Sequence, residues 1–214
     1  MSDELYYLIT DISILSTVIP LVVALFSYNK AHHKLWWVLF LMSFTWLASD
    51  CISWYLGQHR INTFLLFHIY KMVSTSLYAV FFAITLKDFV NRWFIYLGFI
   101  GYVILHLLVL TYTDGWYRPV AIVPIISSAL PLTLCIILFY RMLLEASIEK
   151  LTDSPLYWIN SATLIHLGVA LIAKISQEFI YLDKAGENLW MIVIFSSIIH
   201  NLIFAVGIWK IRAK

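Results

Sequence analysis

The amino-acid sequence predicts an all-α membrane protein, built as one bundle of seven transmembrane helices, and three observations support this prediction. Hydrophobic residues make up 62% of the 214 residues and charged residues only 12%, whereas soluble domains contain about 45–50% apolar and about 25% charged residues. The apolar residues gather in seven stretches of about 20 residues or more, the length that crosses a bilayer as a helix. The basic residues fall mostly on alternate connections. We therefore expect the lipid bilayer as the environment, and the net charge of +2 does not suggest a nucleic-acid partner.

The seven predicted helices follow one another with short connections, so we expect a single domain over residues 1–214. The first stretch follows the acidic start Met1–Glu4, which lacks the basic region of a cleaved signal peptide and is expected to stay in the protein. The next four stretches each start close to a basic residue, the sixth starts at Pro155, and the seventh ends at Lys210. The predicted helices span residues 5–28, 34–57, 62–86, 93–112, 118–141, 155–181 and 187–209.

The distribution of basic residues predicts the orientation of this bundle. With the N-terminus outside and the C-terminus in the cytoplasm, nine basic residues fall on the cytoplasmic side and three on the outer side, which is the asymmetry expected of membrane proteins. Tryptophans gather at both predicted interfaces, as an aromatic belt does. The cytoplasmic set is Lys30, Lys34, Lys87, Arg92, Arg141, Lys150, Lys210, Arg212 and Lys214, and the outer set is Arg60, Arg118 and Lys184.

A weak internal similarity indicates a parallel 3+1+3 repeat. The segment from Ser16 to Pro20 resembles the segment from Ser127 to Pro131, and both belong to predicted helices that run in the same direction. Such repeats occur in sugar-type transporters. The repeat is an expectation about how the bundle is built.

Ionisable residues at a similar depth on several predicted helices indicate a polar site in the outer half of the bundle. Lys174 lies in an otherwise apolar stretch, where a lone charge costs about 2.5–3.5 kcal/mol on insertion scales. Because charges avoid lipid, these side chains are expected to face the bundle interior. They form either a pocket for a small polar or zwitterionic molecule, or for protons, or a structural network of ion pairs. The predicted ligand-binding residues are Trp46, Asp50, His68, Lys71, His106, Lys174 and Glu178.

A second set of polar residues is expected nearer the middle of the membrane. His166 lies in the sixth predicted helix, and His200 and Asn201 lie in the seventh. They are either hydrogen-bonded across a helix interface or a relay between the outer pocket and the cytoplasmic ends.

No catalytic residue, cofactor or metal-ligand set follows from the sequence. A retinal Schiff base needs a lysine in the last helix, and that helix has none before Lys210 at its end. An intramembrane metal-dependent hydrolase stays an alternative with His68, His106 and Asp50 as ligands, although nearby lysines would repel a metal ion.

Three sequence features resemble those of an uncharacterised seven-helix bacterial membrane family, whose members occur alone or as the input module of sensor histidine kinases. They are Ser154-Pro-Leu-Tyr-Trp-Ile-Asn160, Gly207-Ile-Trp-Lys210 and the acidic Asp50 near the outer end of its helix. The resemblance implies a bacterial cytoplasmic membrane protein with a receptor-like sensory role. It also implies a separate histidine kinase or other cytoplasmic partner, for which the connection after Arg141 is the expected docking surface. A small-solute transporter is the alternative, and the oligomeric state stays open, a homodimer included.

Overall fold

The structure is a computed structural model that describes residues 3–30, 34–113, 115–117, 120, 122–145, 151–179 and 183–211, with the side chains of all of these except 3–7, 30, 117, 177–179 and 183–188. Every regular element within these ranges is helical, and none of the described residues forms a strand. The long helices are α1 (Asp3–Phe26), α2 (Lys34–Gln58), α3 (Phe64–Thr85), α4 (Arg92–Tyr112), α5 (Ile122–Glu145), α7 (Pro155–Phe179) and α8 (Asp183–Lys210), and two short 3₁₀ turns are η1 (Tyr28–Lys30) and η2 (Gly115–Tyr117).

All seven long helices contain a segment that is long and apolar enough to cross a membrane. This confirms the predicted all-α class and indicates an integral membrane protein. The fifth helix differs most from its predicted bounds, since α5 begins at Ile122 and ends at Glu145. Starting at Ile122 places Pro124 in the first turn, where its missing N–H breaks no intrahelical hydrogen bond. At the other end, Arg141 Nε lies 2.7 Å from Glu145 Oε1, an i,i+4 pair that supports the extra turn.

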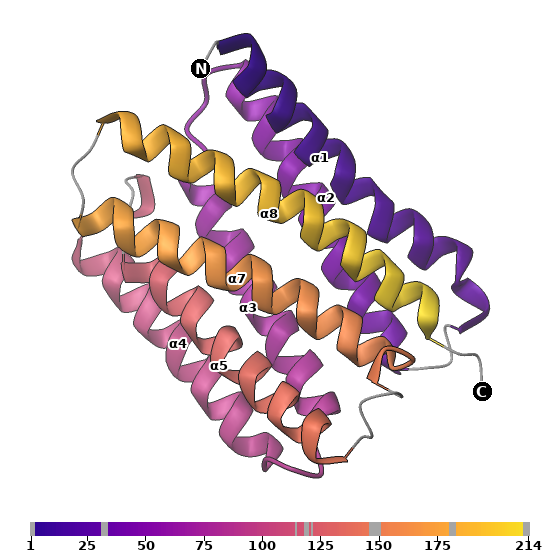
Figure 1. The fold of residues 1–214 in the computed structure, drawn as a ribbon. Coiled ribbons are helices and arrows are strands. Elements are labelled where there is room, and N and C mark those ends of the chain that lie inside the picture. The colour runs from indigo at the N-terminus through magenta and orange to yellow at the C-terminus, as the bar shows by residue number, and fades with distance from the viewer. Residues whose placement is uncertain are drawn as a thin grey trace.

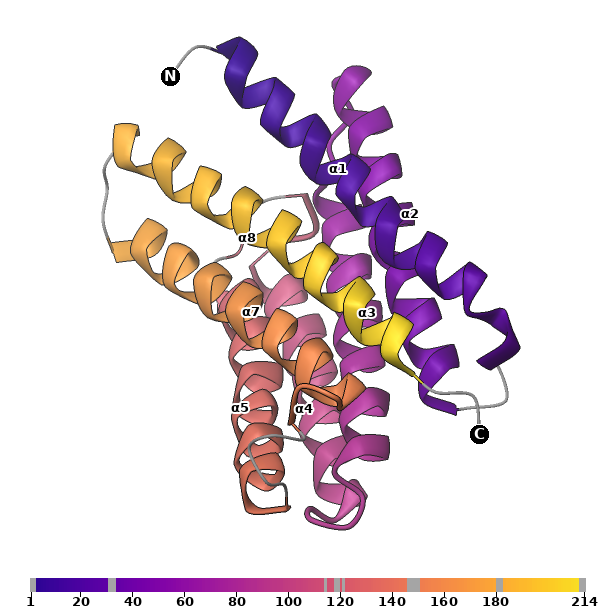
Figure 2. The same ribbon diagram turned by 45° about the vertical axis from the view of Figure 1, so that its right-hand side comes forward.

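Six helices form a ring in chain order, and α4 lies outside it. Helices α1, α2 and α3 pack in succession, α3 contacts α5, and α5, α7 and α8 lead back to α1. Helix α4 packs against α3 and α5, on the side away from α1 (Figures 1 and 2). The start of α1 and the end of α8 lie at opposite ends of the bundle (Figure 1).

The apolar core fills only one half of the bundle. Its members come from the first halves of α2, α4 and α7 and the second halves of α1, α3, α5 and α8, and these halves meet at the end of the bundle where α8 finishes. The largest fully buried apolar side chains there are Trp36, Phe81, Phe82, Phe204, Leu39, Met42, Leu86, Leu138, Ile159 and Ile208. This half is therefore densely packed with apolar side chains, and space for a polar site remains only in the other half.

Helices α7 and α8 approach each other closely within this core half. A Cβ atom added to Gly207 of α8 would lie 3.1 Å from the Ile159 backbone nitrogen and 3.2 Å from the Pro155 carbonyl oxygen of α7. Small residues permit such close helix contacts in membranes. Gly207 therefore allows the start of α7 to pack directly against the end of α8.

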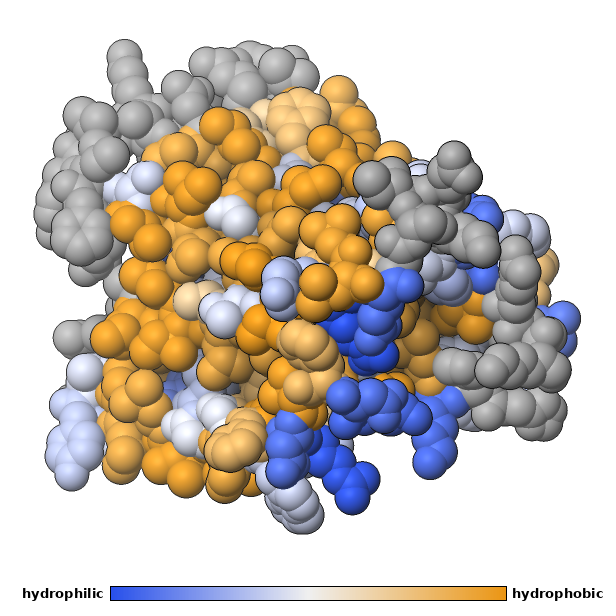
Figure 3. Space-filling view, turned by 60° about the horizontal axis from the view of Figure 1, so that its bottom comes forward, coloured by the Kyte–Doolittle hydropathy of each residue, from blue (hydrophilic) through white to orange (hydrophobic). Residues whose placement is uncertain are grey.

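The outer surface of the bundle is apolar along the helices and polar at one end. Large apolar side chains such as Phe94 and Ile172 are more than 60% exposed, as suits helices that face lipid. Viewed toward the lower end of Figure 1, hydrophilic side chains gather on one part of the surface (Figure 3). Exposed polar residues of this end include Lys87, Asp88 and Arg92.

Candidate functional site

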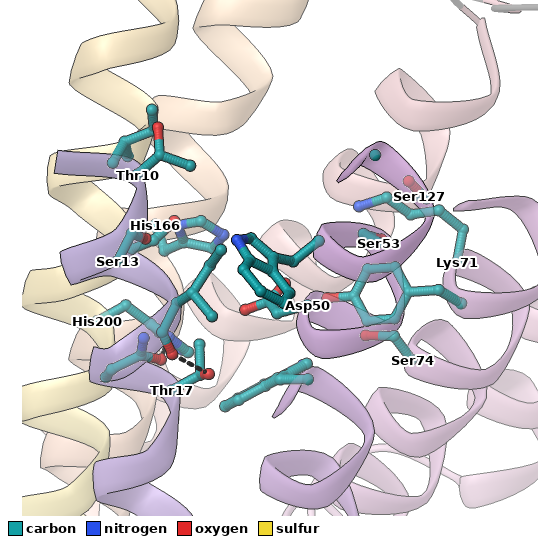
Figure 4. Close-up of a pocket in the computed structure, with 18 of the residues that line it drawn as sticks. Thr10, Ser13, Thr17, Asp50, Ser53, Lys71, Ser74, Ser127, His166 and His200 are labelled. Atoms are coloured by element: carbon teal, nitrogen blue, oxygen red, sulfur yellow. Dashed lines mark hydrogen bonds between the residues drawn. The ribbon is translucent and has the colours of Figure 1, made fainter. Parts of the chain in front are cut away.

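A cavity of about 960 Å³ occupies the half of the bundle opposite the apolar core. Side chains of α1, α2, α3, α5, α7 and α8 line it, and no described residue of α4 does. Its volume is at the upper end of the roughly 300–1,000 Å³ typical of small-molecule sites. The ring of six helices is thus the wall of the cavity, and Figure 4 shows the side chains that converge on it.

The cavity leads from an exposed mouth to a buried floor. Gly57, Gln58 and Arg60 line it at the end of α2, and all three are exposed. At the inner end it is lined by Trp46 and His200, which are only 7% and 4% exposed. Beyond these two residues lies the packed core, so the cavity is closed at the end that the sequence predicts to be cytoplasmic.

Two opposite charges face this cavity without forming an ion pair. Asp50 of α2 and Lys71 of α3 both line it, and neither takes part in any ion pair within 4.0 Å among the described residues. The Asp50 carboxyl lies beside the Thr17 hydroxyl. Lys71 Nζ lies 5.5 Å from the ring centres of both Phe67 and Tyr70, a cation–π arrangement.

Lys174 and Glu178, the other two charged candidates, lie on α7 outside the described lining of the cavity. The Lys174 side chain is partly buried and lies close to that of Lys71, so two lysine amino groups come together beside the cavity wall. Glu178 belongs to α7, but its side chain is outside the part of the structure that is described.

The residues predicted as a deeper relay form part of the same cavity wall. His166, His200 and Asn201 all line it, together with Trp46. The rings of Trp46 and His200 meet edge to face with centres 4.8 Å apart, and the rings of His166 and His200 are 5.1 Å apart. Trp46 of the predicted pocket and the three residues of the predicted relay therefore lie together in the cavity wall, on α2, α7 and α8.

A chain of hydrogen bonds fixes how the His200 ring is protonated. The Ser16 hydroxyl donates to the Ser13 carbonyl, 2.6 Å away, so it must accept from Asn201 Nδ2, at 2.8 Å. The Asn201 oxygen then faces His200 Nδ1, 3.3 Å away, which must carry the proton. In a neutral imidazole the other nitrogen, Nε2, is an acceptor. This buried Nε2 has no hydrogen-bond partner among the described residues.

Hydrogen bonds also fix which nitrogen of the His166 ring carries the proton. The Ser196 hydroxyl donates to the Val193 carbonyl, 2.7 Å away, and therefore accepts from His166 Nδ1 at 3.1 Å. His166 Nε2 is then also an acceptor in the neutral ring. Two imidazoles on neighbouring helices thus turn their N–H groups to the protein and keep a lone pair at Nε2.

His68 and His106, predicted for the ligand site, lie apart from the large cavity. They are 0% and 1% exposed, and His68 Nδ1 lies 3.2 Å from His106 Nε2. His68 Nε2 is 3.1 Å from the Gly115 carbonyl oxygen, and the Tyr102 hydroxyl is 3.0 Å from His106 Nδ1. Since a carbonyl only accepts, Tyr102 donates to His106, His106 to His68 and His68 to Gly115. This histidine pair links α3, α4 and η2.

Sequence reasoning missed the hydroxyl groups that α1 contributes to the cavity. On α1, Thr10, Ser13 and Thr17 recur at helical spacing and all line it. That periodicity is the signal that could have found them, whereas the neighbouring Asp11 is exposed. The other hydroxyl-bearing residues of the lining are Ser53, Tyr70, Ser74, Thr75, Tyr78, Ser127 and Ser197.

The described residues contain no group of three or more histidine, cysteine, aspartate or glutamate side chains placed to hold a metal ion. No protein-family model matches the chain, and comparisons with curated proteins and with solved structures found no significant similarity.

Proposed function

We propose that this protein is a receptor-like sensor of the bacterial cytoplasmic membrane that binds a small polar solute in the large cavity and signals to a separate cytoplasmic partner, such as a histidine kinase. The solute enters from the outer side, at the mouth beside Arg60. Asp50 and Lys71 hold it, and His166, His200 and Asn201 respond to it.

The observation that supports this proposal most is a polar cavity whose opposite charges are not paired with each other. Charges inside a membrane bundle are costly unless they have a partner, so they mark functional sites. Among the described residues neither Asp50 nor Lys71 has an ion-pair partner, so both charges are available to a bound solute.

The route to the cytoplasmic side runs along α7 and α8. His200 of α8 lines the cavity, and Lys210 at the end of the same helix donates to the Thr152 carbonyl at 2.8 Å. Trp158 of α7 donates to the same carbonyl at 2.7 Å. Both helices therefore hold the connection between α5 and α7, and a shift of either helix at the cavity moves the surface that a partner would contact.

A small-solute transporter with a 3+1+3 repeat is the second candidate. The ring consists of α1, α2 and α3 followed by α5, α7 and α8, with α4 outside, which is the grouping that such a repeat requires. Uptake of a solute into proteoliposomes separates the two, because a sensor carries none across. The closed inner end of the cavity favours the sensor.

The test is native mass spectrometry of the protein ejected directly from membranes. The variant is the double substitution Asp50→Asn and Lys71→Met. Its matched control is Asp88→Asn and Lys87→Met, which removes the same two charges from exposed positions. We expect a small-molecule adduct on the wild type and the control that the cavity variant lacks. An equal adduct on all three, or none on any, would contradict a ligand site in the cavity.

A further inference from the structure

We infer that the ligand is a small zwitterion, with an ammonium group held by Asp50 and a carboxylate held by Lys71. This inference rests on the proposed function, since it names the class of solute that the cavity binds. It is carried by Asp50 and Lys71, which both line the cavity and have no ion-pair partner among the described residues, and by the way these two groups are placed.

Asp50 defines the ammonium end. It lines the cavity, and no described residue forms an ion pair with it. A carboxylate accepts hydrogen bonds and attracts positive charge, so the group that suits it best is an ammonium with several N–H donors.

Aromatic rings in the cavity lining also suit a cation. Trp46 and Trp54 both line the cavity, and the centre of the Trp46 ring lies 4.8 Å from that of the His200 ring. The face of a tryptophan ring attracts cations within about 6 Å. A neutral ligand would gain nothing from this attraction, and a ligand with only a negative charge would be repelled by Asp50.

The opposite side of the cavity defines the carboxylate end. Lys71 lines it, and Arg60 adds a positive charge at the mouth. In the view of Figure 4, Asp50 lies between His166 and His200 on one side and Lys71 on the other. An anionic group is therefore attracted to the Lys71 side of the cavity.

Separation of the two ends explains why a zwitterion fits better than a pair of free ions. Asp50 and Lys71 are more than 4.0 Å apart at their charged atoms, since they form no ion pair. A molecule with both charges on one short skeleton places each charge beside its partner and fills the gap between them. The chemical class is therefore that of amino acids.

The experiment is titration calorimetry on the wild-type protein in nanodiscs, with probes that separate the two charges. The zwitterions are glycine, β-alanine, 4-aminobutyrate and 6-aminohexanoate. The single-charge controls are butyrate and butylamine, and the neutral control is glucose. We expect at least one zwitterion to bind about tenfold or more tightly than the single-charge and neutral probes, since each charge-assisted contact contributes a factor of about this size.

Single substitutions then assign each end. Asp50→Asn is expected to weaken the bound zwitterion about tenfold and leave butyrate unchanged or tighter, while Lys71→Met weakens the zwitterion and leaves butylamine unchanged or tighter. The control pair Lys87→Met and Asp88→Asn is expected to change nothing, and circular dichroism checks that every variant is folded.

Three results would overturn the inference. Glucose or a single-charge probe could bind as tightly as every zwitterion, the cavity substitutions could leave the binding of the zwitterion unchanged, or no zwitterion could bind at all. The native mass spectrometry above keeps these failures separate from failure of the proposed function. An adduct that depends on Asp50 and Lys71, seen while no zwitterion binds, would mean that the cavity is a ligand site for another class of solute.

Discussion

Replacing His106 by phenylalanine is expected to destabilise the fold without weakening ligand binding. The ring of His106 joins Tyr102 of α4 to His68 of α3, and phenylalanine fills a similar space but forms neither hydrogen bond. His68 Nδ1 then loses the donor that lies 3.2 Å away, while its Nε2 keeps the Gly115 carbonyl. The contrast matters because sequence reasoning placed His106 in the ligand site.

The size of the effect follows from the two hydrogen bonds that are lost. Removing one partner of a buried polar group costs about 1–3 kcal/mol, and hydrogen bonds between membrane helices contribute about 0.6 kcal/mol on average and up to about 1.7. The Tyr102 hydroxyl has Thr75 and Ser127 nearby as other partners, so its loss is partly recovered. We therefore expect His106→Phe to lower the free energy of unfolding by about 1–3 kcal/mol.

The assay is equilibrium unfolding in bicelles by steric trapping, with calorimetric binding of the solute on the same samples. His59→Phe is the matched control, because His59 is exposed at the end of α2 and its replacement should change stability by less than about 0.5 kcal/mol. The reasoning is refuted if His106→Phe is as stable as the control. It is also refuted if binding falls more than about tenfold while stability is unchanged, since that would make His106 a ligand contact.

Three further substitutions test the packed half of the bundle. Gly207→Ala pushes the end of α8 against Ile159 and is expected to cost about 1–3 kcal/mol, seen as a lower thermal midpoint in detergent; an unchanged midpoint would show that the two helices separate freely. Asn160→Leu removes a 2.9 Å hydrogen bond to the Cys135 carbonyl, but it also removes a buried amide oxygen that has no partner among the described residues. The free energy of unfolding should therefore change by less than about 1 kcal/mol. Loss of folding would contradict this expectation. Arg141→Met frees the Thr85 carbonyl, which accepts from Arg141 Nη1 at 2.6 Å, and is expected to cost about 1 kcal/mol in steric trapping; the cost must exceed that of Glu145→Gln, which removes only the exposed ion pair.

Hydropathy was sufficient to predict the seven helices, because lipid imposes one length and one composition on every span. Its errors lie at helix ends, where capping and proline geometry decide, as at Ile122 and Pro124. The orientation, the 3+1+3 repeat and the resemblance to bacterial sensor modules remain predictions.

The depth of the candidate site residues along their helices could be predicted from the sequence, but the neighbour that each side chain faces could not. Asp50, Lys71 and Trp46 were chosen because charges and amphipathic rings turn away from lipid, and all three line the cavity. His68 and His106 lie at a similar depth, yet they turn toward each other, since depth along a helix carries no information on which neighbour a side chain meets. The hydroxyls of α1 gave a weaker signal, because a threonine such as Thr17 satisfies itself on its own helix at the Ile14 carbonyl and is tolerated in lipid as well.

Labelling of introduced cysteines tests the central claim, a water-filled cavity that opens on the outer side only. In a background with both native cysteines replaced by serine, Ser53→Cys and Ser74→Cys place a thiol on the cavity lining, and Ser154→Cys places one at the opposite end of the bundle. A charged, membrane-impermeant thiol reagent is applied to intact cells and to inverted vesicles. We predict that the two cavity positions react from outside and the position at 154 reacts only in inverted vesicles. Reaction of the cavity positions in inverted vesicles alone, or in neither preparation, would contradict the account.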